Sequence, residues 1–161
     1  MKFLKVILFG LFLSAATQAF GQTETFDMMT FTTPKGWERN KFEDKIVLLN
    51  PNRSCGILIF KSHESSGPGA TDFKNQWRER VAQPYNTTAE PKMQTPLAAE
   101  NSAGEVLMGA ASIEVNGGKS PVMLTLYRGF GRATSVLALN PTRCEEEFVD
   151  FMVKLEFGKP R

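Results

Sequence analysis

The chain has 161 residues, of which 19 are basic and 17 are acidic, and its formal net charge is +2. This length suits one domain with a substantial hydrophobic core rather than two domains. Acidic and basic residues are interleaved, whereas sequence-independent binding to nucleic acids needs clustered, uncompensated Lys and Arg, so we expect no nucleic-acid partner.

Residues 1–21 have the pattern of a secretory signal peptide. Lys2 and Lys5 precede a short apolar run, and small residues follow from Ser14 onward. The run is too short to span a bilayer, and this order of charge, apolar run and small residues is typical of exported precursors. We therefore expect an extracytoplasmic protein, periplasmic or secreted, with no membrane anchor after cleavage.

The small residues at the end of this segment allow cleavage after Ala19 or after Gly21, and we favour Gly21. The mature domain then spans residues 22–161. Removal of Lys2 and Lys5 leaves 17 basic residues against 17 acidic ones, so the basic character of the precursor belongs to the segment that is removed.

Strand patterns fill the first part of the mature chain. Alternating side chains predict strands over residues 26–33, 37–42, 45–49 and 55–61. Pro34-Lys35-Gly36 predicts a turn before the second of these strands. The run from Ile57 to Phe60 has no polar alternation, which indicates a central strand that is covered on both faces.

The next segment carries the signals of a loop, a helix and a long connection. Residues 62–70 contain Ser-Ser-Gly-Pro-Gly, which is a loop composition. Thr71 is placed to cap a helix that ends before Pro84 and whose apolar residues recur at four-residue intervals: Phe73, Trp77 and Val81. Residues 85–103 hold few large apolar groups, and a connection of this length in a compact domain is functional or mobile.

The second half of the chain predicts more strands and a C-terminal helix. Asn116-Gly117 is a favourable two-residue hairpin turn, Gly129 and Gly131 make a second turn, and strands are expected over residues 105–115, 122–127 and 133–139. Thr142-x-x-Glu145 reads as a capping box, Gly158 can close the helix, and the apolar stripe is Phe148, Phe151, Met152 and Leu155. The whole order predicts one α+β domain, an antiparallel sheet with helices packed on it.

Two cysteines are present, Cys55 and Cys144, and both lie in the exported part. An even count in an oxidising compartment suits a disulfide, and the alternative is a pair of buried thiols. The close Cys-x-x-Cys spacing that activates a thiolate is absent, which argues against a redox enzyme.

His63 is the only histidine, so any mechanism that uses a histidine depends on it. With Ser65 and Ser66 nearby, a small hydrolase is one interpretation, in which His63 is the general base and either serine the nucleophile. No Gly-x-Ser-x-Gly elbow is present, and we favour a solvated loop histidine. A zinc site would need three or four converging ligands, so we expect no metal site and no cofactor.

The cluster most like a binding site is Arg128-Gly129-Phe130-Gly131-Arg132. Two guanidiniums beside an exposed aromatic ring at a turn can hold a carboxylate, a phosphate or a sugar acid, or stack on a planar ligand. The alternative, which we favour, is a glycine-rich turn with solvated arginines. The candidate ligand-binding residues are therefore Arg128, Phe130 and Arg132.

Thr33-Pro34-Lys35-Gly36-Trp37 resembles an opening that recurs in PsbP-like domains, including the DcrB-type exported proteins of bacteria: a strand, Pro-x-Gly-Trp and further strands. The later order of a helix, a glycine-turned hairpin and a C-terminal helix is also similar. The resemblance implies an antiparallel sheet between helices, an α/β/α sandwich, in a group better known for binding and assembly than for catalysis. No ligand-binding residue of that group maps onto this chain.

The sequence thus predicts an exported binding or assembly module without enzymatic activity, with an unknown protein or small molecule as its partner. The expected contact surface combines the connection of residues 85–103 with the turn of residues 128–132. The small hydrolase that uses His63 is the alternative.

Overall fold

The computed structural model describes residues 21–65, 67–97 and 103–160. The predicted signal peptide falls on residues 1–20, which lie outside this part of the chain, as does Ser66. None of the described helices is long and apolar enough to cross a membrane.

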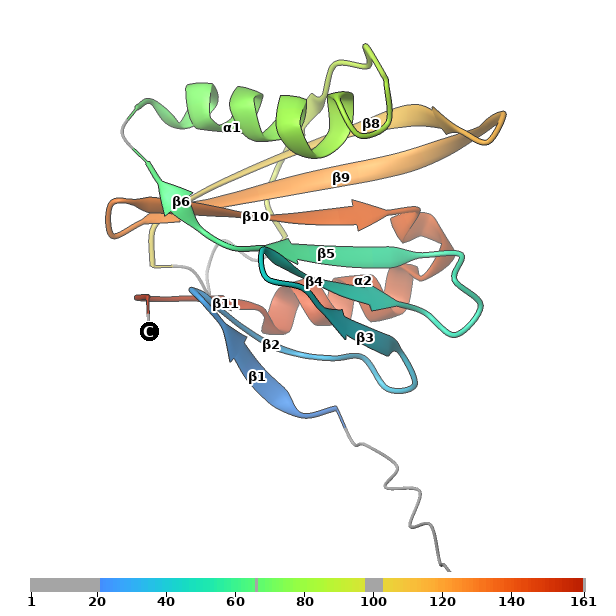
Figure 1. The fold of residues 1–161 in the computed structure, drawn as a ribbon, viewed down its shortest axis with the longest axis horizontal. Helices are drawn as coiled ribbons and strands as arrows, with labels where there is room; N and C mark the ends of the chain where they lie inside the picture. Colours follow the sequence, from blue (N-terminus) through green and yellow to red (C-terminus); the bar gives the residue numbers. More distant parts are fainter. Residues whose placement is uncertain (1–20, 66, 98–102, 161) are drawn as a thin grey trace, which may run out of the picture.

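A large antiparallel sheet runs through the molecule (Figure 1). Its strands lie in the order β3 (Glu38–Lys41), β4 (Lys45–Leu49), β5 (Gly56–Phe60), β10 (Arg132–Leu139), β9 (Gly118–Gly129), β8 (Glu105–Val115) and β7 (Lys92–Gln94). The two-residue strand β6 (His63–Glu64) pairs with the start of β10. A separate sheet of three strands has the order β1 (Thr23–Phe26), β2 (Met29–Thr32) and β11 (Glu156–Phe157).

Each face of the large sheet is covered by a different helix. Helix α1 (Gly69–Trp77) continues into a π-helical turn, η1 (Arg78–Ala82), and buries Phe73 and Trp77 against one face. Helix α2 (Glu145–Lys154), preceded by the 3₁₀ turn η3 (Pro141–Arg143), packs with the three-stranded sheet on the other face. The expected α+β layout, an antiparallel sheet between helices, is confirmed.

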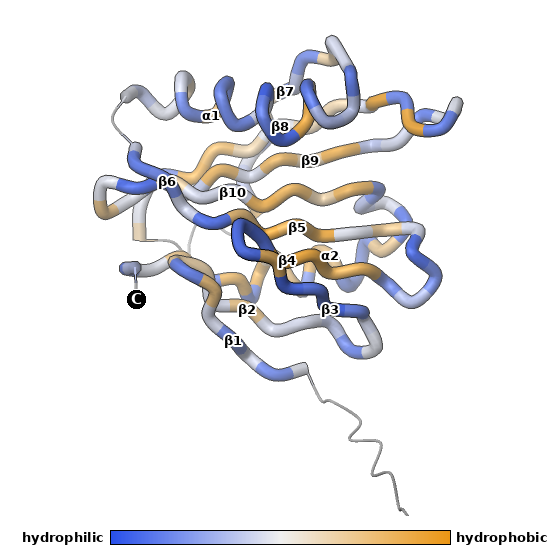
Figure 2. Tube along the Cα trace, viewed as in Figure 1, coloured by the Kyte–Doolittle hydropathy of each residue, from blue (hydrophilic) through white to orange (hydrophobic). Residues whose placement is uncertain are grey.

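The central strands carry apolar side chains on both faces. On β5, Leu58 and Phe60 face α1, whereas Ile57 and Ile59 face α2, as expected for a strand covered on both sides. Figure 2 shows these apolar strands in the middle of the sheet, with polar residues on α1 and on the edge strand β3. Burial on both faces therefore places the sheet at the centre of the hydrophobic core.

The single strand predicted over residues 26–33 is wrong, because the chain reverses there. Phe26 pairs with Met29, and Asp27 adopts a left-handed conformation with φ of 55°. Asp tolerates this conformation better than most residues, and its carboxylate also accepts a hydrogen bond from the Ser62 backbone N–H at 2.6 Å. A hairpin without glycine is thus fixed by a contact from a distant segment.

Both predicted helix caps are wrong by two or more residues. Helix α1 starts at Gly69 with Pro68 at the N-cap, so Thr71 lies inside the first turn. Helix α2 starts at Glu145 with Cys144 at the N-cap, and Thr142 belongs to the 3₁₀ turn. In neither helix does a side chain cap the N-terminus.

The C-terminal helix also ends earlier than Gly158. Its last residue is Lys154, and Leu155 already has an extended backbone. The next two residues pair with β2, with Phe157 opposite Met29. Strand pairing therefore takes over from the helix before a glycine is reached.

The disulfide between Cys55 and Cys144 joins the two halves of the chain. Its Cα atoms are 6.1 Å apart, and both side chains are buried in the core on the α2 face. Cys55 directly precedes β5, and Cys144 is the N-cap residue of α2. The bridge thus fixes the start of α2 against the large sheet.

We expect the double variant Cys55→Ala, Cys144→Ala to unfold more easily than the parent. The bridge closes a loop with a sequence separation of 89 residues, and cross-linking a loop of that size restricts the unfolded chain by about 4 kcal/mol in the loop-entropy model. The free energy of unfolding, taken as the urea midpoint multiplied by the slope, measures the effect, because loss of the cross-link also expands the unfolded chain and raises the slope. An unchanged free energy of unfolding, or an intact mass of the parent that reductant does not raise by two hydrogens, would contradict the bond.

Candidate functional site

The predicted turn joins β9 to β10, and its arginines point into the protein. The central residues are Phe130 and Gly131, with φ of 55° and 72°. Arg132 donates from Nε to the Ser62 hydroxyl at 2.7 Å and from Nη2 to the Ser62 carbonyl O at 3.0 Å. Its guanidinium is therefore held by the segment that leads into β6.

Arg128 ties β9 to the start of α1. Its guanidinium pairs with Asp72 at 2.9 Å, pairs with Glu105 and donates to the Gly67 carbonyl O. It also donates to the Ser65 hydroxyl from Nε and Nη2, at 3.1 and 3.0 Å. Partial burial opposes the charge, but the hydrogen bonds to Glu105 and Asp72 outweigh it and raise the pKa of Arg128.

Phe130 stands at the tip of the turn in an unusual conformation. Residues with positive φ in such two-residue turns are usually Asn, Asp or Gly, and a bulky side chain there is strained. Phe130 remains 45% exposed although its ring contacts Phe157, with ring centroids 6.2 Å apart, and the Lys159 ammonium, 5.9 Å from the ring centre. An exposed apolar ring is thus kept where the backbone favours a small polar residue.

The turn lies beside a small cavity and beside the end of the long connection. The cavity has a volume of about 240 Å³ and is lined by Ser65, Glu105, Arg128, Gly129, Gly131 and Arg132. A Cβ on Gly129 would lie 2.7 Å from the Ala103 carbonyl O. The two parts of the expected surface therefore meet at this end of the sheet, although residues 98–102 of the connection lie outside the described residues.

The earlier part of the connection packs against α1. It contains strand β7, and the Ala89 carbonyl O accepts a hydrogen bond from the Trp77 indole N–H at 3.0 Å. Leu97, the last described residue before the gap, is 43% exposed. The connection is therefore anchored at its first half, and an apolar side chain lies exposed close to its end.

His63 and Ser65 lie two residues apart, but their side chains have different surroundings. His63 is half-buried in the short strand β6, opposite Ala133. The Ser65 hydroxyl donates to the Asp72 carboxylate at 2.6 Å and accepts from Arg128. No hydrogen bond joins His63 to Ser65 in the described part of the chain, so these contacts give the hydrolase interpretation no support.

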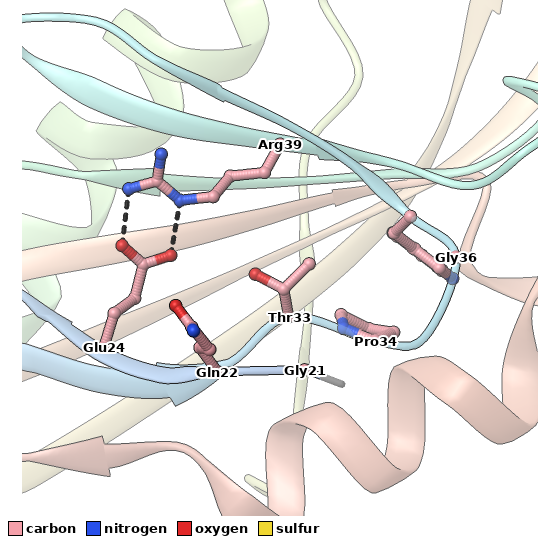
Figure 3. A pocket seen from close by; sticks show the side chains of 8 residues that line it. Gly21, Gln22, Glu24, Thr33, Pro34, Gly36 and Arg39 are labelled. Carbon is pink, nitrogen blue, oxygen red and sulfur yellow. Dashed lines mark hydrogen bonds and ion pairs between the residues drawn. The ribbon is translucent and has the colours of Figure 1, made fainter. Parts of the chain in front are cut away.

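A larger pocket, which sequence reasoning missed, lies where β1 approaches β3 (Figure 3). Its volume is about 410 Å³, and its lining is Gly21, Gln22, Glu24, Thr33, Pro34, Gly36, Trp37 and Arg39. The Arg39 guanidinium donates from Nε and Nη2 to the two carboxylate oxygens of Glu24. This hydrogen-bonded pairing with Glu24 raises the pKa of Arg39.

The Thr-Pro-Lys-Gly-Trp motif forms one wall of that pocket. The Trp37 backbone N–H donates to the Pro34 carbonyl O at 3.1 Å, and Gly36 adopts φ of 79°, which glycine allows without strain. Trp37 is 8% exposed and lines the pocket from the core side. The motif was the sequence signal for this pocket, but Gln22 and Glu24, which complete the lining, lie just before and within the separate strand β1.

No known protein-family model matches the sequence, and a search of curated proteins found no similar sequence. Among solved structures, a crystal structure of a protein from Bacteroides thetaiotaomicron VPI-5482 is similar, with a TM-score of 0.52 and 12% identity over 82% of this chain. The chain spans 46% of that protein's length. At this identity the similarity shows a shared fold alone.

The solution structure of cyanobacterial PsbP (CyanoP) from Synechocystis sp. PCC 6803 also matches, with a TM-score of 0.49 and 10% identity. The match covers 84% of this chain and 90% of the cyanobacterial protein. The layout that the sequence resemblance implied is present in the strands and helices described above.

We expect Arg128→Ala to lower the free energy of unfolding by about 2–3 kcal/mol, because it removes the cation that pairs with Asp72 and the side-chain donor to the Gly67 carbonyl O at a poorly exposed site. Urea unfolding measures this loss. The control is Arg53→Ala, which removes an exposed ion pair with Glu38 and should change stability little. Equal effects of the two substitutions would show that Arg128 does not anchor α1.

We expect His63 to make the folded state less stable in mild acid. Burial lowers the pKa of His63 in the folded state, against the opposing charges of Asp72 and Glu79. The unfolded chain then binds more protons, so stability is complete above the ordinary histidine pKa, about 6.5, and falls as the pH drops through and below it. His63→Gln should lose less stability than the parent between pH 7.5 and 5.5, as measured by urea midpoints. Identical losses would exclude His63 as the titrating group.

Proposed function

We propose that the protein is an exported binding or assembly module without catalytic activity, and that it meets its partner through the Phe130 turn, defined as residues 128–132. The observation that carries this proposal is the exposed ring of Phe130 in a left-handed backbone conformation. Strained residues of this kind concentrate at functional sites, where the rest of the fold holds them in place.

The strain and the exposure of Phe130 are both costs to the folded monomer. A left-handed conformation costs a bulky residue roughly 1–3 kcal/mol, and Asn or Gly would avoid that cost. The exposed part of the ring gains nothing from burial. A partner that covers the ring would recover that area, which explains why an aromatic residue occupies this position.

The arginines of the turn hold the ring in place. Arg128 binds the α1 side and Arg132 binds Ser62, so the two strands that enter and leave the turn are fixed. Both also line the 240 Å³ cavity next to the ring, where they can meet polar groups of the partner. In this proposal Phe130 supplies the apolar contact, and Arg128 and Arg132 position it.

Export agrees with the disulfide as well as with the signal-peptide pattern. A structural disulfide persists in oxidising compartments and is rare in the cytosol. The paired Cys55 and Cys144 therefore support an extracytoplasmic location for the folded domain.

We expect Phe130→Asn to keep or raise the thermal midpoint, because Asn relieves the backbone strain, and to abolish partner binding. The matched control is Phe42→Asn, since Phe42 is 51% exposed in the turn between β3 and β4. A photo-crosslinking residue at position 130 of the exported protein should give a discrete product that one at position 42 does not. Equal products from both positions would refute the proposal.

A further inference from the structure

The pocket between β1 and β3 has walls from three chain segments that are separate in the sequence: the start of β1, the loop after β2 and the start of β3. Its volume of about 410 Å³ falls within the range of roughly 300–1,000 Å³ that is usual for small-molecule sites. Figure 3 shows Glu24 and Arg39 facing each other across the gap, with Gln22 and Thr33 beside them. The pocket is thus large enough for one small ring and is lined with polar groups.

The charged residues in the lining balance each other. Both carboxylate oxygens of Glu24 accept hydrogen bonds from Arg39, and the formal charge of the pair is zero. A charged ligand would lose its hydration in this pocket without meeting an uncompensated opposite charge. The lining therefore favours an uncharged ligand.

The same lining offers hydrogen-bond donors and acceptors together. The Gln22 amide can do both, the Glu24 carboxylate can accept further bonds, and the Arg39 guanidinium has N–H groups beyond the two that Glu24 uses. A hydroxyl group is likewise both donor and acceptor. Ligand hydroxyls can therefore satisfy each of these groups, which a purely donating or purely accepting ligand cannot.

The lining also includes apolar side chains. Pro34 and Trp37 supply them, and the Gly36 turn fixes their relative position. An aromatic side chain beside a few placed polar groups suits a ring that carries C–H groups on its faces and hydroxyls at its edge.

We propose that this pocket binds an uncharged, hydroxyl-rich ring, of the chemical class of neutral sugars. The site is separate from the Phe130 turn and does not depend on the function proposed for that turn. In this proposal, the residues around the Pro-Lys-Gly-Trp motif bind a small molecule.

The start of the chain decides the charge of this pocket. Gly21 packs so closely on Thr33 that a Cβ would collide with the Thr33 carbonyl O, so the Gly21–Gln22 peptide bond belongs to the wall. Cleavage after Ala19 keeps this bond, whereas cleavage after Gly21 replaces it with the ammonium group of Gln22. A neutral pocket therefore requires cleavage after Ala19, which gives the chain that begins at Phe20, and not the cleavage after Gly21 that we favoured from the small residues of the signal peptide.

The test is a titration of the ¹⁵N-labelled chain that begins at Phe20, followed by NMR. The probes are four neutral sugars (glucose, galactose, mannose and N-acetylglucosamine) and two charged ones, glucuronate and glucosamine. We expect the Trp37 indole and Gln22 amide signals to shift and saturate with at least one neutral sugar, while the Trp77 indole signal stays in place. No saturable shift with any neutral sugar, or an equal response to glucose and glucuronate, overturns the proposal.

Two changes each raise the net charge of the pocket by one unit, and both should weaken its preference for neutral over negatively charged sugars. Glu24→Gln and the chain that begins at Gln22 should each bind the neutral sugar about tenfold more weakly, the equivalent of one charge-assisted hydrogen bond, and should gain affinity for glucuronate. The matched control is Glu38→Gln, which removes a carboxylate of β3 that pairs with Arg53 outside the pocket. If Glu24→Gln does not fold, the proposal is judged from the preference of the parent for neutral over charged sugars. If both changed chains fold and keep that preference unchanged, the proposal is overturned.

Discussion

A sheet that is apolar on both faces has to be covered on both faces, and most of this structure follows from that constraint. Alternate residues of β5, β9 and β10 point into two separate clusters of buried side chains. Short elements supply the cover: α1 on one face, and α2 with the three-stranded sheet on the other. Helices of this length are marginal on their own, so their position depends on packing and on tethers.

A specific side-chain contact fixes each of these covering elements to the large sheet. Arg128 binds the start of α1 to β9, the disulfide fixes the start of α2 next to β5, and the Glu24–Arg39 pair joins β1 to the edge strand β3. The two candidate binding features lie at two of these tethers. The Phe130 turn begins at Arg128, and the pocket between β1 and β3 contains the Glu24–Arg39 pair. Both proposals therefore place recognition beside a contact that stabilises the fold.

Local sequence patterns correctly predicted the turns and strands that are determined by neighbouring residues. The Asn116-Gly117 turn, the strand of residues 105–115 and the doubly covered strand around Ile57 were all found from periodicity and turn residues. The hairpin at Asp27 was missed because a contact with Ser62 stabilises it, and Arg128 meets Asp72 across 56 residues of sequence. The pocket at Trp37 was missed for the same reason, since no periodicity in one segment reveals what another segment brings to it.

The small sheet also sets how the domain would bear a mechanical load. β1 and β11 are both antiparallel to β2, so the first and last strands run parallel to each other on either side of it (Figure 1). A pull between residues 21 and 160 acts along these strands, and their hydrogen bonds to β2 must shear together rather than open one after another. Tension between these two ends would therefore load the three-stranded sheet before the large sheet.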